Sequence, residues 1–146
     1  MNARLLKRCH NTSGFVQLDE CFMRYENHNF YNVYNERGNF KVMCNDIIAG
    51  NQFQPFENLT EVVLLKMIEK AVHTPKLFST DKNKTGHADV QEIYSLAQCW
   101  GNLSRTNCWS CLAIARSTIS SSTISYTAGC IPGVVGGRYL NMNCVL

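Results

Sequence analysis

The sequence of 146 residues contains no run of about eighteen apolar residues, the length that a membrane-spanning helix needs. We therefore expect no membrane span within these residues. A concentrated basic surface is also missing, because the 14 Lys and Arg are scattered and leave a formal net charge of only +3. Nucleic-acid-binding proteins usually carry a basic stripe or patch, so we expect no nucleic-acid partner.

Motifs that carry catalysis are absent as well. Ser110 does not stand in a Gly-x-Ser-x-Gly context, and no glycine-rich loop could hold a phosphate. The acidic residues are spread singly, as solvated surface charges usually are. None of the histidines is paired with a nucleophile motif (His10, His28, His73 and His87). We therefore expect a protein that is not an enzyme and that uses no cofactor and no metal.

Cysteine, in contrast, is abundant. Eight cysteines in 146 residues are several times the ordinary usage, a density typical of secreted domains with small cores. The most informative pattern is Cys99-x8-Cys108-x2-Cys111, which is followed by Cys130 and Cys144. Cysteines this close together favour a disulfide framework. We therefore expect a secreted or extracellular protein, because such bridges persist in oxidising compartments.

The spacing Cys108-x2-Cys111 is also that of a redox dithiol or of half a zinc site. A zinc ribbon needs a second such pair, and the sequence has none; His87 stands alone in a polar segment. A thioredoxin-like motif needs a preceding strand in a βαβ unit, whereas residues 102–106 have the composition of a turn. We favour disulfides over both alternatives.

Four Asn-x-Ser/Thr sequons agree with passage through the secretory pathway, where N-glycosylation takes place. Their acceptor residues are Asn11, Asn58, Asn83 and Asn102. The first eight residues include a basic stretch but no apolar stretch before Cys9, so a signal peptide is absent from this chain. We expect that the chain begins inside a longer protein.

Two segments share one plan, which indicates an internal repeat. Cys9-x11-Cys21 and Cys130-x13-Cys144 each place a glycine shortly before an apolar stretch that ends in cysteine, the pattern of a hairpin leading into a core strand. We therefore expect residues 1–35 to be the C-terminal remnant of a first repeat. Residues 36–146 would be a second, nearly complete repeat that lacks its last residues.

Within the second unit, the apolar pattern after Thr60 predicts a helix that lies on a sheet and ends before Pro75. Residues 76–89 are polar, and we expect an exposed loop there. A second helix is predicted from Asn107, a good N-cap residue, with one face toward the core (Cys108, Cys111, Leu112, Ala115 and Ile119). The Ser/Thr-rich residues 117–127 are expected to form a flexible insertion.

Together these motifs resemble a plant family, the ginkbilobin-homologous or stress-antifungal domain, whose signature is Cys-x8-Cys-x2-Cys with a later pair of cysteines. Residues 94–100, residues 137–141 and, in the preceding unit, residues 21–27 are similar to the tandem extracellular region of cysteine-rich receptor-like protein kinases. The resemblance spans nearly all of the chain and is weakest at residues 117–127.

The resemblance implies an α+β fold, in which an antiparallel sheet of about five strands carries two helices packed on one face and is stapled by disulfides. The implied bridges are Cys44 with Cys130, Cys99 with Cys108, and Cys111 with Cys144. Two further cysteines match the last two of the preceding unit, so their implied partners lie upstream and both are unpaired in this chain (Cys9 and Cys21).

The family also implies a function. Its members include non-catalytic extracellular modules that sense a ligand or a partner ectodomain in stress and defence signalling, and we expect such a module here. The alternative is a secreted, mannose-binding antifungal protein that acts on cell-wall glycans. Both expectations place the protein outside the cell or on its outer surface.

Mannose-binding members use an Asn after the first cysteine, an Arg before the last strand and a Glu after the last cysteine. Asn45 and Arg138 match the first two positions. Glu26 matches the third position in the preceding unit, where Phe15 replaces the Arg. Neither unit holds all three, and the competing interpretation is a turn residue at Asn45 and a solvated strand residue at Arg138.

Overall fold

The structure is a computed structural model that describes residues 13–18, 21–35, 40–45, 53–84, 92–101, 103–120 and 136–146. In chain order the elements are β1 (Gly14–Leu18), β2 (Cys21–Tyr25), β3 (Phe40–Cys44), α2 (Phe53–His73), β4 (Phe78–Lys84), β5 (Glu92–Cys99), α3 (Arg105–Ser120), β6 (Gly137–Asn141) and β7 (Cys144–Val145). No helix among the described residues is long and apolar enough to cross a membrane.

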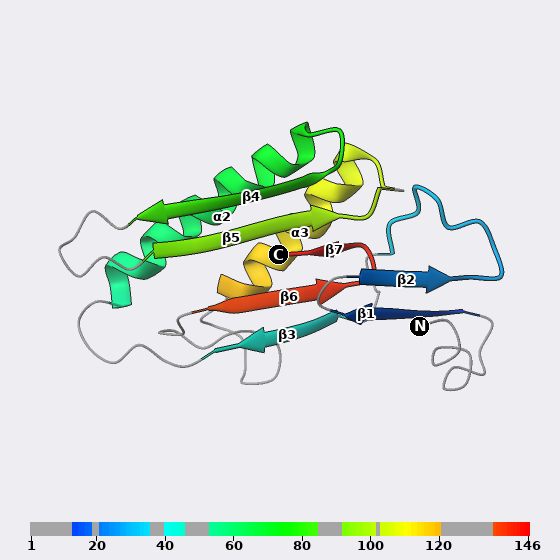
Figure 1. The fold of residues 1–146 in the computed structure, drawn as a ribbon, viewed down its shortest axis with the longest axis horizontal. Coiled ribbons are helices and arrows are strands. Elements are labelled where there is room, and N and C mark those ends of the chain that lie inside the picture. The colour runs from blue at the N-terminus through cyan, green and yellow to red at the C-terminus, as the bar shows by residue number, and fades with distance from the viewer. Residues whose placement is uncertain are drawn as a thin grey trace.

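One sheet contains the strands β3 to β7, in the order β3-β6-β7-β5-β4, and all neighbouring pairs are antiparallel. Both helices lie behind this sheet in Figure 1, where α2 packs on β4 and β5 and α3 packs on β5, β6 and β7. The opposite face of the sheet is called the outer face below. The predicted α+β fold, with about five antiparallel strands and two helices on one face, is confirmed.

Strand alternation decides which side chains meet the helices. On β5, Ile93, Ala97 and Cys99 are buried on the helix side, whereas Tyr94 and Leu96 point to the outer face and are 70% and 42% exposed. A shift of one residue in the strand pairing would move the exposed side chains, Tyr94 and Leu96, into the core. The apolar pattern therefore fixes the register of the sheet.

The core lies between the helices and the sheet. Its most buried residues come from both layers (Met67, Ile68, Ala71, Ala97, Cys99, Leu112 and Ala115). Burying one large apolar side chain contributes about 1.5–3 kcal/mol. Within the described residues a single ion pair links the two helices, Arg116 with Glu61 at 2.9 Å, and both side chains are half-exposed. Apolar burial is therefore the main force that holds the layers together.

The first helix is longer than the sequence predicts. α2 begins at Phe53, well before the expected start after Thr60. The dense apolar run begins only after Thr60, and Pro55 reads as a helix breaker. The first turn of a helix tolerates proline, however, because the N–H that proline lacks would have no partner there. The predicted end is confirmed, since α2 stops at His73.

The second helix also starts earlier than predicted. α3 begins at Arg105, so Asn107, the expected N-cap, lies inside it. The backbone N–H of Asn107 donates to Ser104 Oγ at 3.2 Å, which makes Ser104 the cap. The predicted core face is confirmed, with four residues buried and a fifth at the margin (Cys108, Cys111, Leu112, Ala115 and Ile119).

A flexible insertion is the wrong prediction for residues 117–120, because they form the last turn of α3. The hydroxyls of Ser117 and Thr118 donate to Ile114 O at 2.9 and 2.7 Å. These bonds explain how a Ser/Thr-rich stretch remains helical, since the hydroxyls find acceptors within the helix itself. Residues 121–127 lie outside the described residues.

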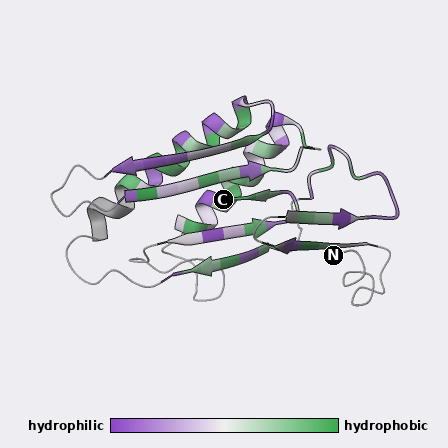
Figure 2. Ribbon diagram, viewed as in Figure 1, coloured by the Kyte–Doolittle hydropathy of each residue, from purple (hydrophilic) through white to green (hydrophobic). Residues whose placement is uncertain are grey.

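An exposed loop is also the wrong prediction for much of residues 76–89. Residues 78–84 form β4, which pairs with β5 from Phe78 opposite Gln98 to Lys84 opposite Glu92. β4 is hydrophilic along most of its length (Figure 2), because it is an edge strand of which only Ser79 is buried. Lysines on such a strand discourage pairing with other chains. Residues 85–89 lie outside the described residues.

Two disulfides bind one turn of α3 to two neighbouring strands. Cys108 is bonded to Cys99 on β5, and Cys111 is bonded to Cys144 on β7. Within the sheet, Cys99 and Cys144 stand directly opposite each other. All four cysteines are at most 1% exposed. These bridges are two of the three that the family resemblance implies.

The third implied bridge is described only in part. Cys44 is disulfide-bonded. Cys130, its implied partner, lies outside the described residues. The same holds for Cys9 and for the side chain of Cys21, so their expected unpaired state stays a prediction.

The hairpin β1–β2 forms a separate two-stranded sheet beside the connection between β5 and α3. The Phe22 ring stacks on Trp100 with the centroids 4.1 Å apart. After the hairpin, Asn32 accepts a hydrogen bond from the Ser104 N–H through its side-chain oxygen at 2.8 Å. Its backbone oxygen accepts another from Asn107 Nδ2 at 3.2 Å. Residues 22–32 thus complete the N-terminal end of α3.

Leu112 on α3 is fully buried, and we expect Leu112→Ala to lower the free energy of unfolding by about 2–5 kcal/mol because it leaves a cavity in the core. Leu65→Ala on α2 is the matched control. Leu65 is 38% exposed, and its truncation should cost less than about 1 kcal/mol. Urea unfolding of the oxidised protein, followed by circular dichroism, measures both values. Equal losses would contradict the packing described here.

Candidate functional site

Two of the three residues expected to bind mannose lie close together on the outer face. Cys44 pairs with Gly137, so Asn45 and Arg138 are diagonal neighbours across β3 and β6. The Asn45 N–H donates to Gly136 O at 2.8 Å. The Asn45 side chain lies close over Gly136, because a Cβ at that position would come within 3.1 Å of Asn45 Nδ2. Both Asn45 and Arg138 are exposed. One amide and one guanidinium can therefore approach the same molecule.

The third residue, Glu26, does not join them. Its carboxylate accepts a hydrogen bond from Arg24 Nε at 2.8 Å, and both side chains are only 7% exposed. The Arg24 guanidinium also lies 4.5 Å from the centroid of the Phe30 ring. β2, which precedes Glu26, points to the right in Figure 1 and ends near that edge of the molecule, whereas β3, which precedes Asn45, points to the left. Glu26 therefore serves a local ion pair and is remote from Asn45 and Arg138.

The four sequons are described unevenly. Asn83 lies on β4, half-buried and opposite Ile93 in the sheet. Asn58 lies within α2. Asn11 and Asn102 lie outside the described residues. Glycosylation at any of the four stays a prediction.

A charged and aromatic cluster occupies the outer face of β4 and β5. Glu92 accepts a hydrogen bond from the Tyr94 hydroxyl at 2.6 Å and pairs with Lys82 Nζ at 2.8 Å. Lys82 Nζ also lies 5.1 Å from the centroid of the Tyr94 ring. The hydrogen bond from Lys82 lowers the pKa of the Glu92 carboxyl and raises the pKa of Lys82. These exposed contacts hold the Tyr94 ring in one orientation but add little stability.

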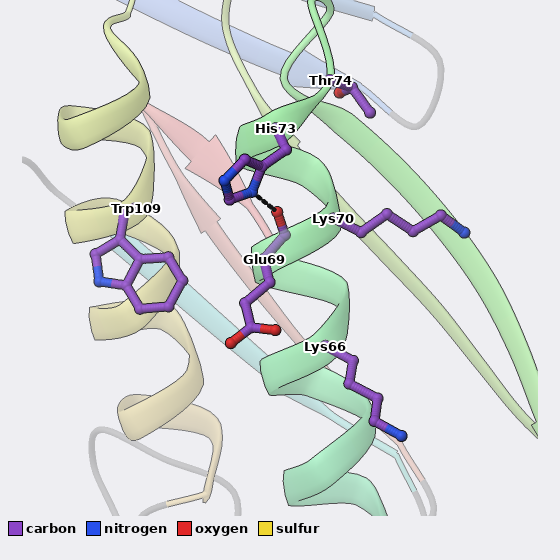
Figure 3. Close-up of a pocket in the computed structure, with 6 residues that line it drawn as sticks. All are labelled: Lys66, Glu69, Lys70, His73, Thr74 and Trp109. Atoms are coloured by element: carbon purple, nitrogen blue, oxygen red, sulfur yellow. Dashed lines mark hydrogen bonds between the residues drawn. The ribbon is translucent and has the colours of Figure 1, made fainter.

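A shallow groove of about 790 Å³ lies between α2 and α3 on their solvent side (Figure 3). Its lining residues are Lys66, Glu69, Lys70, His73, Thr74 and Trp109. Trp109, on α3, is 39% exposed. Figure 3 shows the Glu69 carboxylate and the His73 ring on the side of α2 that faces Trp109, whereas Lys66 and Lys70 extend away from it. Glu69 and His73 share a side because they are four residues apart on a helix.

The polar groups near Trp109 differ in whether they already have partners. His73 Nδ1 lies 2.7 Å from the backbone oxygen of Glu69. A carbonyl only accepts, so Nδ1 carries the proton in this bond. Within the described residues, the Glu69 carboxylate makes no hydrogen bond or ion pair. The Thr74 hydroxyl is already bonded to the backbone of Ala71 and Phe78.

Sequence reasoning misses this groove. In the sequence, Glu69 and His73 look like isolated surface residues. Trp109 lies between Cys108 and Cys111, and only the cysteine spacing there forms a recognisable pattern. The available signal is the spacing of four residues between Glu69 and His73 on one helix. Their proximity to Trp109 depends on how α2 and α3 pack, which no local pattern encodes.

Aromatic surface, one carboxylate and one imidazole suit noncovalent binding. Among the residues that the structure describes, no three His, Cys, Asp or Glu side chains converge as metal ligands. The exposed indole beside the Glu69 carboxylate makes the groove a candidate binding site.

Comparison with known families connects these features to a lineage. The family profile described as salt stress response/antifungal matches residues 43–146. The chain belongs to this family. The disulfides Cys99–Cys108 and Cys111–Cys144 both lie within the matched region.

Curated relatives of this chain include kinases and secretory proteins. Cysteine-rich receptor-like protein kinase 2 of Arabidopsis thaliana is 30% identical over 146 residues, with 97% of this chain and 20% of the kinase covered. Cysteine-rich repeat secretory protein 38 of Arabidopsis thaliana is 26% identical, with 96% of this chain and 52% of that protein covered. The antimicrobial ginkbilobin-2-like protein of Castanea crenata is 27% identical, with 94% and 52% covered. The chain thus spans about a fifth of the kinase and about half of the other two.

Solved structures of two Arabidopsis thaliana proteins share the fold. The tandem DUF26 ectodomain of the cysteine-rich receptor-like protein PDLP8 has a TM-score of 0.67 at 18% identity, and that of PDLP5 has 0.62 at 22%. The alignments cover 98% and 99% of this chain and 60% of each ectodomain chain. At this level of identity the likeness establishes the fold of the salt stress response/antifungal domain and no further property.

We expect the Glu92 carboxyl to titrate below 4.5, its ordinary pKa, because Lys82 and Tyr94 donate hydrogen bonds to the ionised form. Lys82→Met should move the midpoint upward. Lys66→Met removes the same charge from α2 and should leave it unchanged. Nuclear magnetic resonance of the side-chain carbon measures each midpoint.

The sign of the effect on stability follows from this shift. The folded-state pKa of Glu92 is lowered, so its small stabilising contribution is present above the ordinary pKa and is lost as the pH falls through the folded value. An unchanged midpoint in Lys82→Met would show that Lys82 is not the cause.

Proposed function

We propose that the protein is a non-catalytic extracellular module that binds a ligand or a partner ectodomain in stress or defence signalling. It would act as part of a cysteine-rich receptor-like kinase or of a secreted relative. Family membership and the names of the relatives support a module of this type. The buried disulfides fit an oxidising extracellular space.

The groove between α2 and α3 is the observation that carries the proposal. The core is complete without Trp109, so its exposed indole is available for contact with another molecule. Tryptophan is among the residues most enriched at binding hot spots. Beside it, the Glu69 carboxylate has no partner within the described part of the chain. An exposed aromatic surface with unsatisfied polar groups is typical of a recognition site.

We also infer that residues 1–35 are the end of a preceding repeat. The hairpin β1–β2 corresponds to β6–β7, because Gly14 stands before Cys21 at the same distance as Gly137 before Cys144. A two-stranded hairpin is at best marginally stable alone in water, so it needs neighbours to pack against. Both solved relatives are tandem ectodomains, which supports this division.

The recognition proposal predicts that binding depends on Trp109. The oxidised protein is immobilised for surface plasmon resonance and tested against a panel of plant receptor ectodomains and secreted peptides. We expect at least one of them to bind the protein saturably. Trp109→Ala should weaken that interaction about 30-fold, as expected for a hot spot worth about 2 kcal/mol. Tyr94→Ala is the matched control, since it removes an exposed aromatic ring from the opposite face. Binding that survives Trp109→Ala but is lost in Tyr94→Ala would move the site to the outer face.

A second candidate function is binding of mannose-type glycans on the outer face. The diagonal placement of Asn45 and Arg138 favours it, because amide and guanidinium groups give directed hydrogen bonds to adjacent sugar hydroxyls. The absence of Glu26 from this pair argues for weaker binding than a complete site would give.

Retention on mannan-agarose tests the second candidate. We expect the protein to be retained and Arg138→Ala to abolish retention, because the guanidinium is the strongest donor of the pair. Lys41→Ala removes a cation from the same strand pair and should leave retention intact. Loss of retention in both variants would indicate nonspecific charge effects, and equal retention in all three proteins would exclude a role for Arg138.

A further inference from the structure

The groove between α2 and α3 has a chemical asymmetry that narrows the class of group it can accept. The side chains that face each other across it are Trp109, Glu69 and His73, and Figure 3 shows the indole nitrogen of Trp109 turned away from α2. What faces α2 is the C–H edge of the six-membered ring, whereas the π face, which carries partial negative charge, is turned to the solvent side of the groove (Figure 3).

The charged group aimed at this space is the Glu69 carboxylate, which offers two acceptor oxygens. His73 beside it is already bonded through Nδ1 to the backbone oxygen of Glu69. Lys66 and Lys70 line the groove through their stems, but their side chains extend away from Trp109. The groove thus offers an exposed π face beside a carboxylate that has no partner within the described residues.

We propose that this groove receives an arginine side chain of a protein partner. The proposal rests on the recognition function proposed above and names the chemistry of the partner. A guanidinium is planar, positively charged and a hydrogen-bond donor only, so it can stack on Trp109 while its N–H groups bind the Glu69 carboxylate. An anion would meet the Glu69 carboxylate, and a lysine ammonium would lack the flat face that stacks on an indole.

The test uses the two tryptophans as separate reporters. In the ¹⁵N-labelled, oxidised protein, the indole N–H of Trp109 and that of Trp100 give two signals. Trp100 is stacked on Phe22 and serves as the internal reference. The probe is N-acetyl-L-arginine amide, and we expect a saturable shift of the Trp109 signal alone, with a dissociation constant in the millimolar range.

Three comparison probes define the chemistry. N-acetyl-L-citrulline amide has nearly the same shape without the charge, and it should cause no saturable shift. N-acetyl-L-lysine amide should bind at least about threefold more weakly than the arginine probe, because it cannot stack as a plane. Methyl α-mannoside should leave the Trp109 signal unchanged. A saturable response to the mannoside or an equal response to the citrulline probe would overturn the proposal.

Variants identify the carboxylate. Glu69→Gln should weaken the arginine response at least about fivefold, because it removes the charge and keeps the shape. Asp81→Asn removes the same charge from β4, outside the groove, and should leave the response unchanged. An arginine response that persists in Glu69→Gln would also overturn the proposal.

The outcomes separate this proposal from the broader one. If the arginine probe fails while a binder found by surface plasmon resonance still depends on Trp109, the groove is a recognition site for a different chemistry. If Trp109→Ala leaves that binder unaffected while the arginine probe shifts Trp109, the groove binds guanidinium but does not carry the proposed function.

Discussion

The fold depends on one crossing point, where a single turn of α3 is covalently bonded to two neighbouring strands. Cys108 and Cys111 project from the same side of the helix, and their partners Cys99 and Cys144 stand opposite each other on β5 and β7. Because the two bonds leave for different strands, α3 can neither slide along the sheet nor turn about its own axis. With sequence separations of 9 and 33, the bridges also restrict the unfolded chain, by about 3 and 4 kcal/mol in the loop-entropy view.

This crossing also decides where the candidate binding site lies. Cys108 and Cys111 face the core, so Trp109 between them is forced to the solvent side of α3 by the helical period. α2 packs beside α3 and brings Glu69 and His73 to the same side. The aromatic wall of the groove is thus positioned by the same bonds that stabilise the domain. The fold and the candidate binding site therefore share one constraint.

The α+β fold was predicted through the family resemblance, whereas local signals predicted parts of the two helices. Pro75 marked the end of α2, and apolar periodicity marked the buried face of α3, from Cys108 to Ala115. The edge strand β4 was missed because its residues are polar and show no apolar alternation. It is a strand because its backbone forms hydrogen bonds with β5. The early start of α2 was hidden by Pro55, which the first turn accepts. The groove escaped because it joins α2 to α3, a tertiary arrangement that the sequence does not spell out locally.

The asparagine at position 32 has a consequence for how the molecule loosens. Its side chain and backbone bind Ser104 and Asn107 at the start of α3, and it holds a left-handed backbone with φ of 56° to do so. Fraying of that first turn therefore removes hydrogen bonds from the segment after β2, and release of that segment exposes amide groups of the helix. We therefore expect these two distant parts of the chain to open together and their amide protons to exchange with water at linked rates.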